Sequence, residues 1–573
     1  MLASNPNIMI KLFNTLFLFL LGTFIYAQQK NFASPVNFPI VLNGNFGEIR
    51  GNHFHAGIDI KTKGETGLPV FSIEEGFVSR ISVSATGYGN ALYIDHPSGY
   101  TSVYGHLEEF SPSIAHWVKS QQYKQKSFEV NLYPEKNQFS VKKGEAIAKS
   151  GNTGGSAGPH LHFEMRRTEN QHPVNPLFYN FEVADETKPN VENLYAYPLS
   201  TDSHVSGNTD KQHFKLVYYG GAYHLKGIQS LNVFGEIGFG VDAIDYFDNN
   251  WSKCGIYQLE YWVDNQLINS FQFDELDYSK MRYINSHIDY EAYIRNNKKI
   301  HKTFVDPGNK LDIYRQTYNG GLFSFNDGKR HHLQIMLYDV NMNTSEIDFY
   351  VVSTEPVEHQ AAETLGKLNY YTDNSYSTED FELYIPIDAL YTDLDFIYKE
   401  GRIPEGAYSN LHRVQDKYTP LQKAIQLKIK PVNLPDELQD KALIALFDIQ
   451  TGKFRSVGGT YANGWVEGKS RNFGDFCVVV DSIAPEIRPL SIKNNVLLEK
   501  DRLRFKIEDG LSGIKSYTGT IDGKWVLFEY DAKRDLLVYN FDEHIKKDKN
   551  HKLQLIVEDL KGNKNTFFST FNY

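Results

Sequence analysis

The stretch GNTGGSAGPHLHFE, residues Gly151–Glu164, carries the pattern on which the interpretation of the whole chain depends. It contains His160 and His162, separated by Leu161. Successive side chains of a β-strand point to opposite faces, so both imidazoles are expected on one face and Leu161 on the other. The glycine-rich run before them predicts turns rather than a helix. Two histidines on one strand face indicate a metal site or a proton-transfer site.

Length and composition set the fold class. A chain of 573 residues is too long for one hydrophobic core and predicts roughly three to five domains. The aromatic fraction of 14% comes mostly from Tyr and Phe, which favour strands, and short alternating runs predict a mainly β protein. A net charge of −11 without a concentrated basic stripe argues against nucleic-acid binding.

Cys254 and Cys477 lie far apart, lack CxxC spacing and are interpreted as plain buried residues.

Residues 1–27 predict a secretory signal peptide. After Met9, a lysine precedes an apolar run from Leu12 to Ile25, which is short for a membrane span, and Ala27 is a candidate cleavage site. No cysteine follows the cleavage site, so no lipid anchor is expected. We therefore expect an exported protein, periplasmic or extracellular, without stable membrane insertion.

The rest of the chain divides into β-rich modules. An antiparallel β domain is expected over residues 28–182, with a hairpin of strands Ala91–Ile94 and Tyr100–Leu107. Immunoglobulin-like β-sandwiches are expected over residues 183–355 and 481–573, because these parts repeat each other. The matched segments are Asp185-x3-Pro189 with Asp481-x3-Pro485, residues 254–265 with 512–523, and residues 332–343 with 552–563.

Two other features complete this division. The first sandwich carries an insertion at residues 270–325, rich in Tyr and charge. Between the two copies, residues 356–480 form another β-rich module, interpreted as a third sandwich.

Two polar clusters precede the glycine-rich stretch. His55 and Asp59 are four residues apart in a strand-like segment, so their side chains can share a face. With one histidine of the HxH pair they would supply three ligands and leave a fourth position open, as in a catalytic zinc site. His106 ends a hairpin strand. Each cluster alone is typical of structural or surface histidines, and their combination favours a zinc site.

Three motifs carry a resemblance to a known family. HFHAGIDI (residues 53–60), SVYGHL (102–107) and GNTGGSAGPHLHFEMR (151–166) resemble, in this order, the lysostaphin/LytM-type zinc metalloendopeptidases. The resemblance extends from about Asn43 to Pro176 and includes lesser features such as PVFSIEEGFV and VKKGEAIAKSGNTG.

The resemblance implies a zinc-dependent enzyme that cuts peptide bonds of peptidoglycan, at cross-links or stem peptides. Zinc would polarise the scissile carbonyl and lower the pKa of a water molecule, and two histidines would accept and donate protons in an order left open. All five expected positions are filled, which implies activity. The implied ligands are His55, Asp59 and His162, the catalytic residues His106 and His160, and the groove residues Tyr104, Gly154, Gly155 and Gly158.

Compared with compact family members, the chain has an extra segment, residues 111–139. Its aromatic residues either cover the sheet, which we favour, or narrow the substrate groove. They are Trp117, Tyr123, Phe128 and Tyr133.

The alternative to an active enzyme is a catalytically silent or autoinhibited regulator of a separate cell-wall amidase, with the zinc covered by this segment or by a sandwich. A third possibility is an envelope adhesion or scaffold protein, in which the sandwiches bind an envelope protein partner.

Several titratable residues lack a motif. His53, His116 and the pair His331/His332 are interpreted as lying outside the metal site. Four aspartates at the sandwich ends are consistent with either calcium binding or turn-forming hydrogen bonds, of which we favour the second. They are Asp185, Asp339, Asp481 and Asp559.

Overall fold

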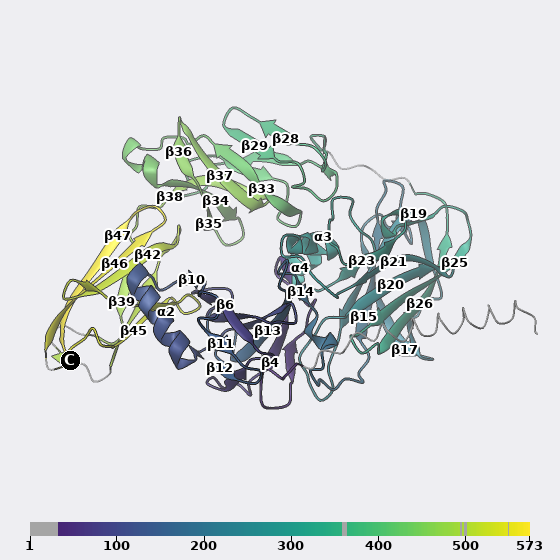
Figure 1. Ribbon diagram of the computed structural model, residues 1–573. Helices are drawn as coiled ribbons and strands as arrows, with labels where there is room; N and C mark the ends of the chain where they lie inside the picture. Colours follow the sequence, from purple (N-terminus) through teal and green to yellow (C-terminus); the bar gives the residue numbers. More distant parts are fainter. Residues whose placement is uncertain (1–31, 358–363, 493–495, 498–500, 548) are drawn as a thin grey trace, which may run out of the picture.

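The computed structural model describes residues 32–357, 364–492, 496–497, 501–547 and 549–573. The expected signal peptide, residues 1–27, lies outside this part of the chain. The described residues form a mainly β protein, as predicted, and they are arranged as four units that close into a ring (Figure 1). Among them no helix is both long and apolar enough to cross a membrane.

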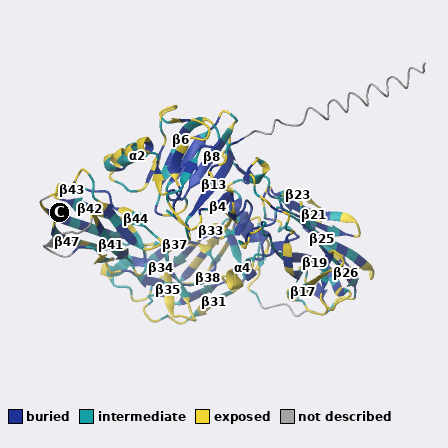
Figure 2. Ribbon diagram, turned by 90° about the horizontal axis from the view of Figure 1, so that it is seen from below, coloured by how far each residue is buried: buried dark blue, intermediate teal, exposed yellow. Residues whose placement is uncertain are grey.

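The N-terminal unit contains a nine-stranded sheet, ordered β1-β4-β13-β8-β7-β6-β10 with β11 beside β6 and β14 beside β13, and a three-stranded sheet, β5-β12-β9. β13 is buried along most of its length, and Figure 2 shows it among other buried strands. The elements are β1 (Leu42–Gly44), β2 (Ile49–Arg50), β3 (His53–Phe54), β4 (Ile58–Lys61), β5 (Pro69–Phe71), β6 (Gly76–Val83), β7 (Ala91–Asp95), β8 (Tyr100–Gly105), β9 (Glu109–Phe110), α2 (Pro112–Gln125), β10 (Val130–Leu132), β11 (Ser140–Val141), β12 (Ala146–Lys149), β13 (His160–Arg167), β14 (Pro173–Val174) and the 3-10 helix η1 (Pro176–Phe178).

The predicted hairpin of this unit is present as β7 and β8, with bounds shifted by one or two residues. The extra segment, for which no regular structure is predicted, contains the helix α2 and the strand β10. Ile114, Val118 and Gln122 recur every four residues and are buried, which is the spacing of one helix face. Pro112 occupies the first turn, where the missing N–H costs nothing.

The second unit is one twelve-stranded sheet that closes on itself, whereas the sequence predicted two separate sandwich sheets. The long strand β19 causes the difference. Its residues 231–233 pair in parallel with β26, and its residues 237–244 pair in antiparallel fashion with β15. The elements are β15 (Asn190–Pro198), β16 (His204–Val205), β17 (Gln212–Tyr219), β18 (Ala222–Leu225), β19 (Leu231–Ile244), β20 (Gln258–Val263), β21 (Gln266–Gln272), η2 (Met281–Tyr283), α3 (Ile284–His287), α4 (Tyr290–Asn296), β22 (His301–Lys302), β23 (Tyr314–Thr317), η3 (Asn319–Gly321), β24 (Phe323–Phe325), β25 (Arg330–Tyr338) and β26 (Thr344–Ser353).

The third unit packs two five-stranded sheets around one core, with a short pair β27–β30 beside them. Its elements are β27 (Lys367–Leu368), β28 (Asn374–Ser377), β29 (Phe381–Ile385), β30 (Leu394–Asp395), β31 (Tyr398–Gly401), β32 (Leu411–Val414), β33 (Pro420–Ile429), η4 (Asp436–Lys441), β34 (Ala442–Asp448), β35 (Lys453–Gly458), β36 (Thr460–Ala462), β37 (Trp465–Asn472) and β38 (Gly474–Val480).

The fourth unit packs a four-stranded sheet on a five-stranded one. Buried and accessible residues alternate along its strands, as in β46, so one side of each strand faces the core. The elements are β39 (Glu486–Pro489), β40 (Val496–Leu497), β41 (Arg502–Glu508), β42 (Ile514–Ile521), β43 (Lys524–Trp525), β44 (Glu529–Asp531), β45 (Leu536–Asn540), β46 (Asn550–Asp559) and β47 (Lys564–Asn572).

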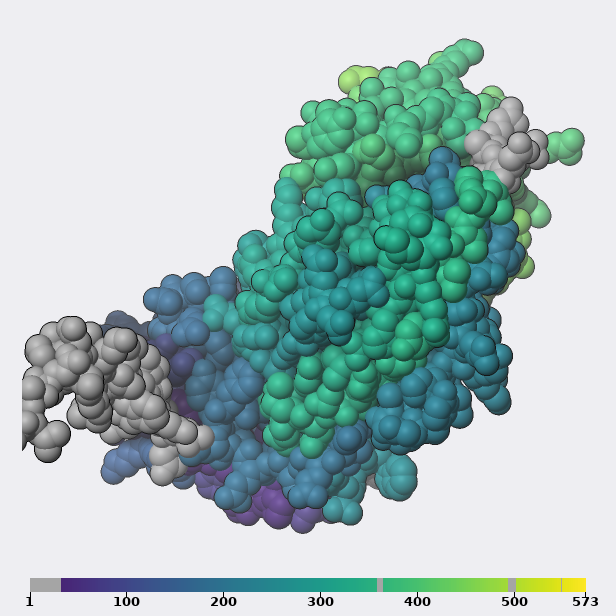
Figure 3. All heavy atoms as spheres, turned by 90° about the vertical axis from the view of Figure 1, so that its right-hand side faces the viewer, coloured from purple at the N-terminus to yellow at the C-terminus, as the bar shows by residue number. Residues whose placement is uncertain are grey.

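The units contact each other through specific side chains. Phe54 of the N-terminal unit lies in the core of the second unit, with its ring centroid 4.9 Å from that of Phe273. Arg282 of the second unit donates hydrogen bonds to Leu421 O and Arg471 O of the third. Figure 3 shows the second unit, in teal, between the N-terminal and third units. The ring closes where α2 meets the fourth unit.

We expect Phe273→Ala to destabilise the junction of the first two units. Phe273 is fully buried, and removal of such a ring costs about 3–5 kcal/mol of folding free energy. The melting temperature should fall, and the connection between the two units should be cleaved faster by protease. Phe568→Ala is the control, because that ring is 66% exposed. Equal melting temperatures of the two variants would contradict this account of the junction.

Candidate metal centre and catalytic site

The register of the central strand β13 brings the site together. His162 pairs with Asp59 of β4 on one side and with Gly105 of β8 on the other. His160 and His162 line the same cleft, whereas Leu161 between them is fully buried, as the alternation in the sequence predicts.

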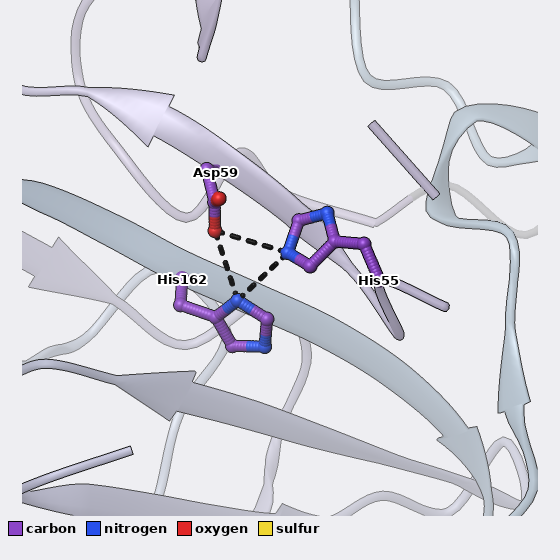
Figure 4. Close-up of side chains that lie close together, drawn as sticks. All are labelled: His55, Asp59 and His162. Atoms are coloured by element: carbon purple, nitrogen blue, oxygen red, sulfur yellow. Dashed lines mark hydrogen bonds and ion pairs between the residues drawn. The ribbon is translucent and has the colours of Figure 1, made fainter. Parts of the chain in front are cut away.

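Three side chains converge on one point (Figure 4). Asp59 Oδ1 lies 3.1 Å from His55 Nε2 and 2.9 Å from His162 Nδ1. The two ring nitrogens are 3.1 Å apart. His55 and His162 are 6% and 4% exposed and Asp59 is 4% exposed, so little water screens the cluster. The predicted ligand positions are therefore neighbours in space.

The remaining ring nitrogens fix the tautomers of both histidines. His55 Nδ1 lies 2.8 Å from Asn45 O, and His162 Nε2 lies 2.7 Å from Glu164 Oε1. Both partners are acceptors, so these two nitrogens carry the protons. In the neutral histidines, His55 Nε2 and His162 Nδ1 are therefore the nitrogens that can bind a cation beside Asp59 Oδ1.

This arrangement fits a bound cation. Two imidazole nitrogens and one carboxylate oxygen are a zinc donor set, and tetrahedral zinc would hold such atoms about 3.4 Å apart. The site also attracts positive charge: burial disfavours the imidazolium, but Asp59 and Glu164 outweigh it and raise the pKa of His162 to about 9. The outer partners Asn45 O and Glu164 are those that commonly orient metal-binding histidines.

The two predicted catalytic histidines lie beside this cluster. His160 Nε2 is 3.4 Å from Asp59 Oδ1, and the rings of His160 and His106 are 4.7 Å apart. His106 Nδ1 lies 2.8 Å from Thr153 O, and His160 Nδ1 lies 2.9 Å from Gly158 O. Both Nδ1 atoms therefore carry protons, which leaves each Nε2 as the nitrogen available for chemistry.

Gly57 allows His55 and Asp59 to approach β13. A Cβ at this position would lie 2.3 Å from Phe163 O and 2.7 Å from Glu164 Cγ. Any side chain would push the ligand-bearing segment away from His162.

A buried network that the sequence did not reveal supports His162. Glu164 is fully buried and accepts hydrogen bonds from Arg166, Tyr88 and Tyr278, the last of which belongs to the second unit. Although burial favours the neutral acid, Arg166 and His162 hold the pKa of Glu164 well below its usual range. A signal was present in the sequence, since Glu164 and Arg166 continue the alternate positions of the HxH pair along one strand face.

The cluster lies in an open cleft of about 740 Å³. Gly155 and Gly158 line this cleft as predicted, together with Tyr88 and the basic residue Arg50, neither of which the sequence singled out. Arg50 Nη2 lies 3.0 Å from Asp59 Oδ2 and 2.8 Å from Glu48 Oε2. Arg50 therefore orients the oxygen of Asp59 that does not face the histidines.

Two predicted groove residues are not in the cleft. Tyr104 is fully buried, pairs with Phe163 and accepts a hydrogen bond from Ile73 N, because its strand position faces the core. Gly154 packs against the neighbouring loop, where a Cβ would lie 2.3 Å from Gly89 N. Both predictions were wrong, and Gly154 serves loop packing.

The aromatic residues of the extra segment do not line the cleft. Trp117 and Phe128 pack against the core of the N-terminal unit, as favoured from the sequence. Tyr133 is 67% exposed. Tyr123 contacts the fourth unit, where it donates a hydrogen bond to Asp542 and stacks on His544.

The other histidines lie outside the metal cluster. His53 lines the cleft but donates Nδ1–H to Gly51 O, and His116 is exposed on α2. His331 and His332 pair with Asp264 and Asp348 in the second unit. Both cysteines, Cys254 and Cys477, are buried and unpaired, as predicted.

Comparison with known proteins identifies two domains. Peptidase family M23 matches residues 53–127 and 125–176, and the Zu5-like domain matches residues 366–481. A protein named "Uncharacterized metalloprotease" of Haemophilus influenzae is 36% identical over 150 residues, which cover 26% of this chain and 25% of that protein. The DD-carboxypeptidase/endopeptidase Mpg of Neisseria meningitidis serogroup B is 34% identical over 123 residues, covering 22% of each.

Among solved structures, the catalytic domain of the M23 protein EnpA from Enterococcus faecalis is 26% identical, with a TM-score of 0.19. The match covers 25% of this chain and 96% of that structure. The chain thus spans about a quarter of the length of the curated relatives it matches.

The family match makes the N-terminal unit a peptidase domain, and its cluster of His55, Asp59 and His162 fits a metal site. This unit is a peptidase M23 domain, and the resemblance to the lysostaphin/LytM-type enzymes is confirmed. The third unit, expected as another sandwich, packs two sheets around one core and matches the Zu5-like domain.

We expect Glu164→Gln to weaken metal binding about 10–100-fold, because the variant loses the carboxylate that orients His162. Competition with a chromophoric zinc chelator measures the affinity. Glu169→Gln is the control, since Glu169 is exposed at the end of the same hairpin. An unchanged affinity in a folded Glu164→Gln protein would show that His162 needs no orientation from this carboxylate.

Proposed function

We propose that the chain is an exported zinc-dependent endopeptidase that cleaves peptide bonds in peptidoglycan. The observation that carries the proposal is the convergence of His55, Asp59 and His162, with His106 and His160 beside them in one cleft. The names of the relatives, metalloprotease and DD-carboxypeptidase/endopeptidase, support the reaction and the substrate. The apolar run at residues 12–25 supports export.

The five residues divide the chemistry between them. When bound, zinc would polarise the scissile carbonyl and lower the pKa of a water molecule toward neutrality. Burial and the neighbouring rings of His162 and His160 lower the pKa of His106 to about 3, so His106 is neutral at pH 7 and its unprotonated Nε2 can accept a hydrogen bond from that water. His160 Nε2, beside Asp59, can hold a proton and donate a hydrogen bond to the developing oxyanion.

The cleft suits an acidic or polar peptide. Arg50, Lys61 and Lys63 line it, and Gly155 and Gly158 expose backbone groups at its wall. Basic side chains favour substrates with free carboxylates, and glycines let an extended peptide approach the backbone closely. The surroundings of the metal site therefore support a peptide rather than an apolar substrate.

We expect His106→Ala and His160→Ala to retain zinc but lose about 10²–10⁴-fold in activity, the size of a general acid–base contribution. His162→Ala should lose both zinc and activity. Muropeptide release from purified sacculi measures activity, and elemental analysis measures zinc content. His116→Ala is the control, because His116 is exposed on α2, outside the cleft.

Full activity of the His162→Ala protein would overturn the ligand assignment. Metal-loaded wild-type protein without any muropeptide release would overturn the proposed reaction.

A second candidate function, a restrained enzyme or a regulator of another hydrolase, is favoured by one contact. Lys533 of the fourth unit donates hydrogen bonds to Asn152 O (2.5 Å) and Ser156 O (3.0 Å). Ser156 lines the cleft and lies 3.1 Å, Oγ to Nδ1, from His160. The fourth unit thus holds the loop that positions a catalytic histidine.

We expect Lys533→Ala to change muropeptide release severalfold, with an increase if the contact restrains the glycine-rich loop and a decrease if it positions His160. Lys524→Ala, at an exposed position of the same unit, is the control. Equal rates for wild type and Lys533→Ala would remove the support for control by the fourth unit.

A further inference from the structure

Three aspartates gather at the end of the second unit nearest the peptidase domain. Asp185 lies in the connection between the two units, Asp245 directly follows β19, and Asp339 directly follows β25. One carboxylate oxygen from each lies within 4.8 Å of the others. Asp185, Asp245 and Asp339 are 8%, 1% and 0% exposed. The sequence pointed to Asp185 and Asp339 but not to Asp245.

Turn formation explains only part of this cluster. Asp339 accepts hydrogen bonds from Asn343 N and Asn343 Nδ2, which is the predicted turn-forming role. Asp185 Oδ1 accepts one from Thr187 N. Asp185 Oδ2 and both oxygens of Asp245, however, are buried without a partner that meets hydrogen-bond geometry. A buried carboxylate without partners is costly, so these oxygens call for a ligand.

The charge around the cluster has one sign. Burial and the carboxylates of Asp185 and Asp339 raise the pKa of Asp245 to about 8, and burial together with Asp339 and Asp248 raises the pKa of Asp185 to about 7. The charges that act on these two groups are all carboxylates. Oδ2 of Asp185 and both oxygens of Asp245, which are buried without a partner, are the atoms that a cation would satisfy.

We propose that Asp185, Asp245 and Asp339 bind a calcium ion. Carboxylate oxygens are the ligands that Ca²⁺ prefers, at about 2.3–2.6 Å, so oxygens on opposite sides of the ion are about 5 Å apart. The separations in the cluster fit within that limit. With no nitrogen or sulfur donor in the cluster, the site favours a hard cation over zinc.

The repeated fourth unit supplies an internal comparison. Asp481, Asp509 and Asp559 form the corresponding cluster, in which Asp481 directly follows β38, Asp509 directly follows β41 and Asp559 ends β46. Asp509 Oδ2 accepts hydrogen bonds from Leu511 N and Gly513 N, and Asp481 Oδ2 accepts one from Ser512 N. These amides take the place of a cation in satisfying the carboxylates.

A lysine also distinguishes the two clusters. In the matched segments, Lys561 of the fourth unit aligns with Asn341 of the second. Burial lowers the pKa of Lys561, and the charges of Asp481 and Asp559 are among those that oppose this effect. Lys561 Nζ itself donates a hydrogen bond to Gly459 O of the third unit. The fourth unit thus has a lysine near its carboxylates, whereas Asn341 donates only a hydrogen bond to Asp185 O.

The position of the proposed ion links it to the peptidase domain. Asp245 and Cys254 exchange two backbone hydrogen bonds, which close the loop of residues 246–253. Asn250 of this loop accepts a hydrogen bond from Lys61 Nζ and donates one to Leu42 O, both in the peptidase domain. A cation that joins Asp185 to Asp245 would hold the connection between the units and this docking loop together.

Calcium titration of the zinc-loaded full-length chain, with free zinc removed, tests the proposal. Calorimetry is expected to show one Ca²⁺ per chain, and the melting temperature is expected to rise by several degrees. Asp245→Asn should weaken binding at least 100-fold, whereas Asp509→Asn in the fourth unit should leave it unchanged. Mg²⁺ should bind more weakly than Ca²⁺, because it demands a tighter octahedral site.

A second variant guards against misfolding. Asn341→Lys introduces the lysine that stands at the matching position of the fourth unit and places a positive charge near the carboxylates, so it should abolish calcium binding while the metal-free protein stays folded. Absence of calcium uptake by wild type at millimolar Ca²⁺ would overturn the proposal and leave protonation as the state of the cluster. Wild-type affinity in Asp245→Asn, or loss of binding in Asp509→Asn, would overturn it too.

Discussion

The register of β13 against its two neighbours is the constraint on which the site depends. It places His162 beside Asp59 of β4 and beside Gly105 of β8, the residue before His106. A shift by one residue would turn both histidines into the core and Leu161 and Phe163 into the cleft. Leu161 and Phe163 are fully buried, so the hydrophobic core holds the ligands in register.

The surroundings of the metal ligands extend beyond the peptidase domain. Tyr278 of the second unit donates a hydrogen bond to Glu164, which in turn accepts the Nε2 proton of His162. The guanidinium carbon of Arg166 also lies over the Tyr278 ring, 4.6 Å from the ring centroid. Since the second unit completes this network, its insertion at residues 270–325 is part of the site. The site therefore includes residues from two domains.

The sequence predicted those parts of the site that depend on local periodicity. Alternation along a strand placed His160 and His162 together, and the HxxxD spacing placed His55 beside Asp59. The groove role that the resemblance implied for Tyr104 failed, because its position in β8 turns the ring into the core. Contacts between distant segments, such as Tyr278 with Glu164, have no local signal and follow only from the packing of the units.

The same limit applies to the helix α2 and to the closed sheet of the second unit. The periodicity of Ile114, Val118 and Gln122 is visible in the sequence, but a polar third member weakens the pattern. β19 pairs with both β15 and β26, and the position of β26 cannot be predicted from the residues of β19.

The repeated segments of the second and fourth units show how differences in loop length and hydrogen-bond donors can change the surroundings of matching carboxylates. Buried carboxylates at the end of a β unit are stable only when donors or a counter-charge compensate them. In the fourth unit, the backbone amides of Leu511 and Gly513 donate hydrogen bonds to Asp509. In the second unit, the loop after Asp245 is longer and contacts the peptidase domain through Asn250. Asn341 stands where the fourth unit has Lys561. The unit beside the catalytic domain is therefore the one whose carboxylates remain open to a cation.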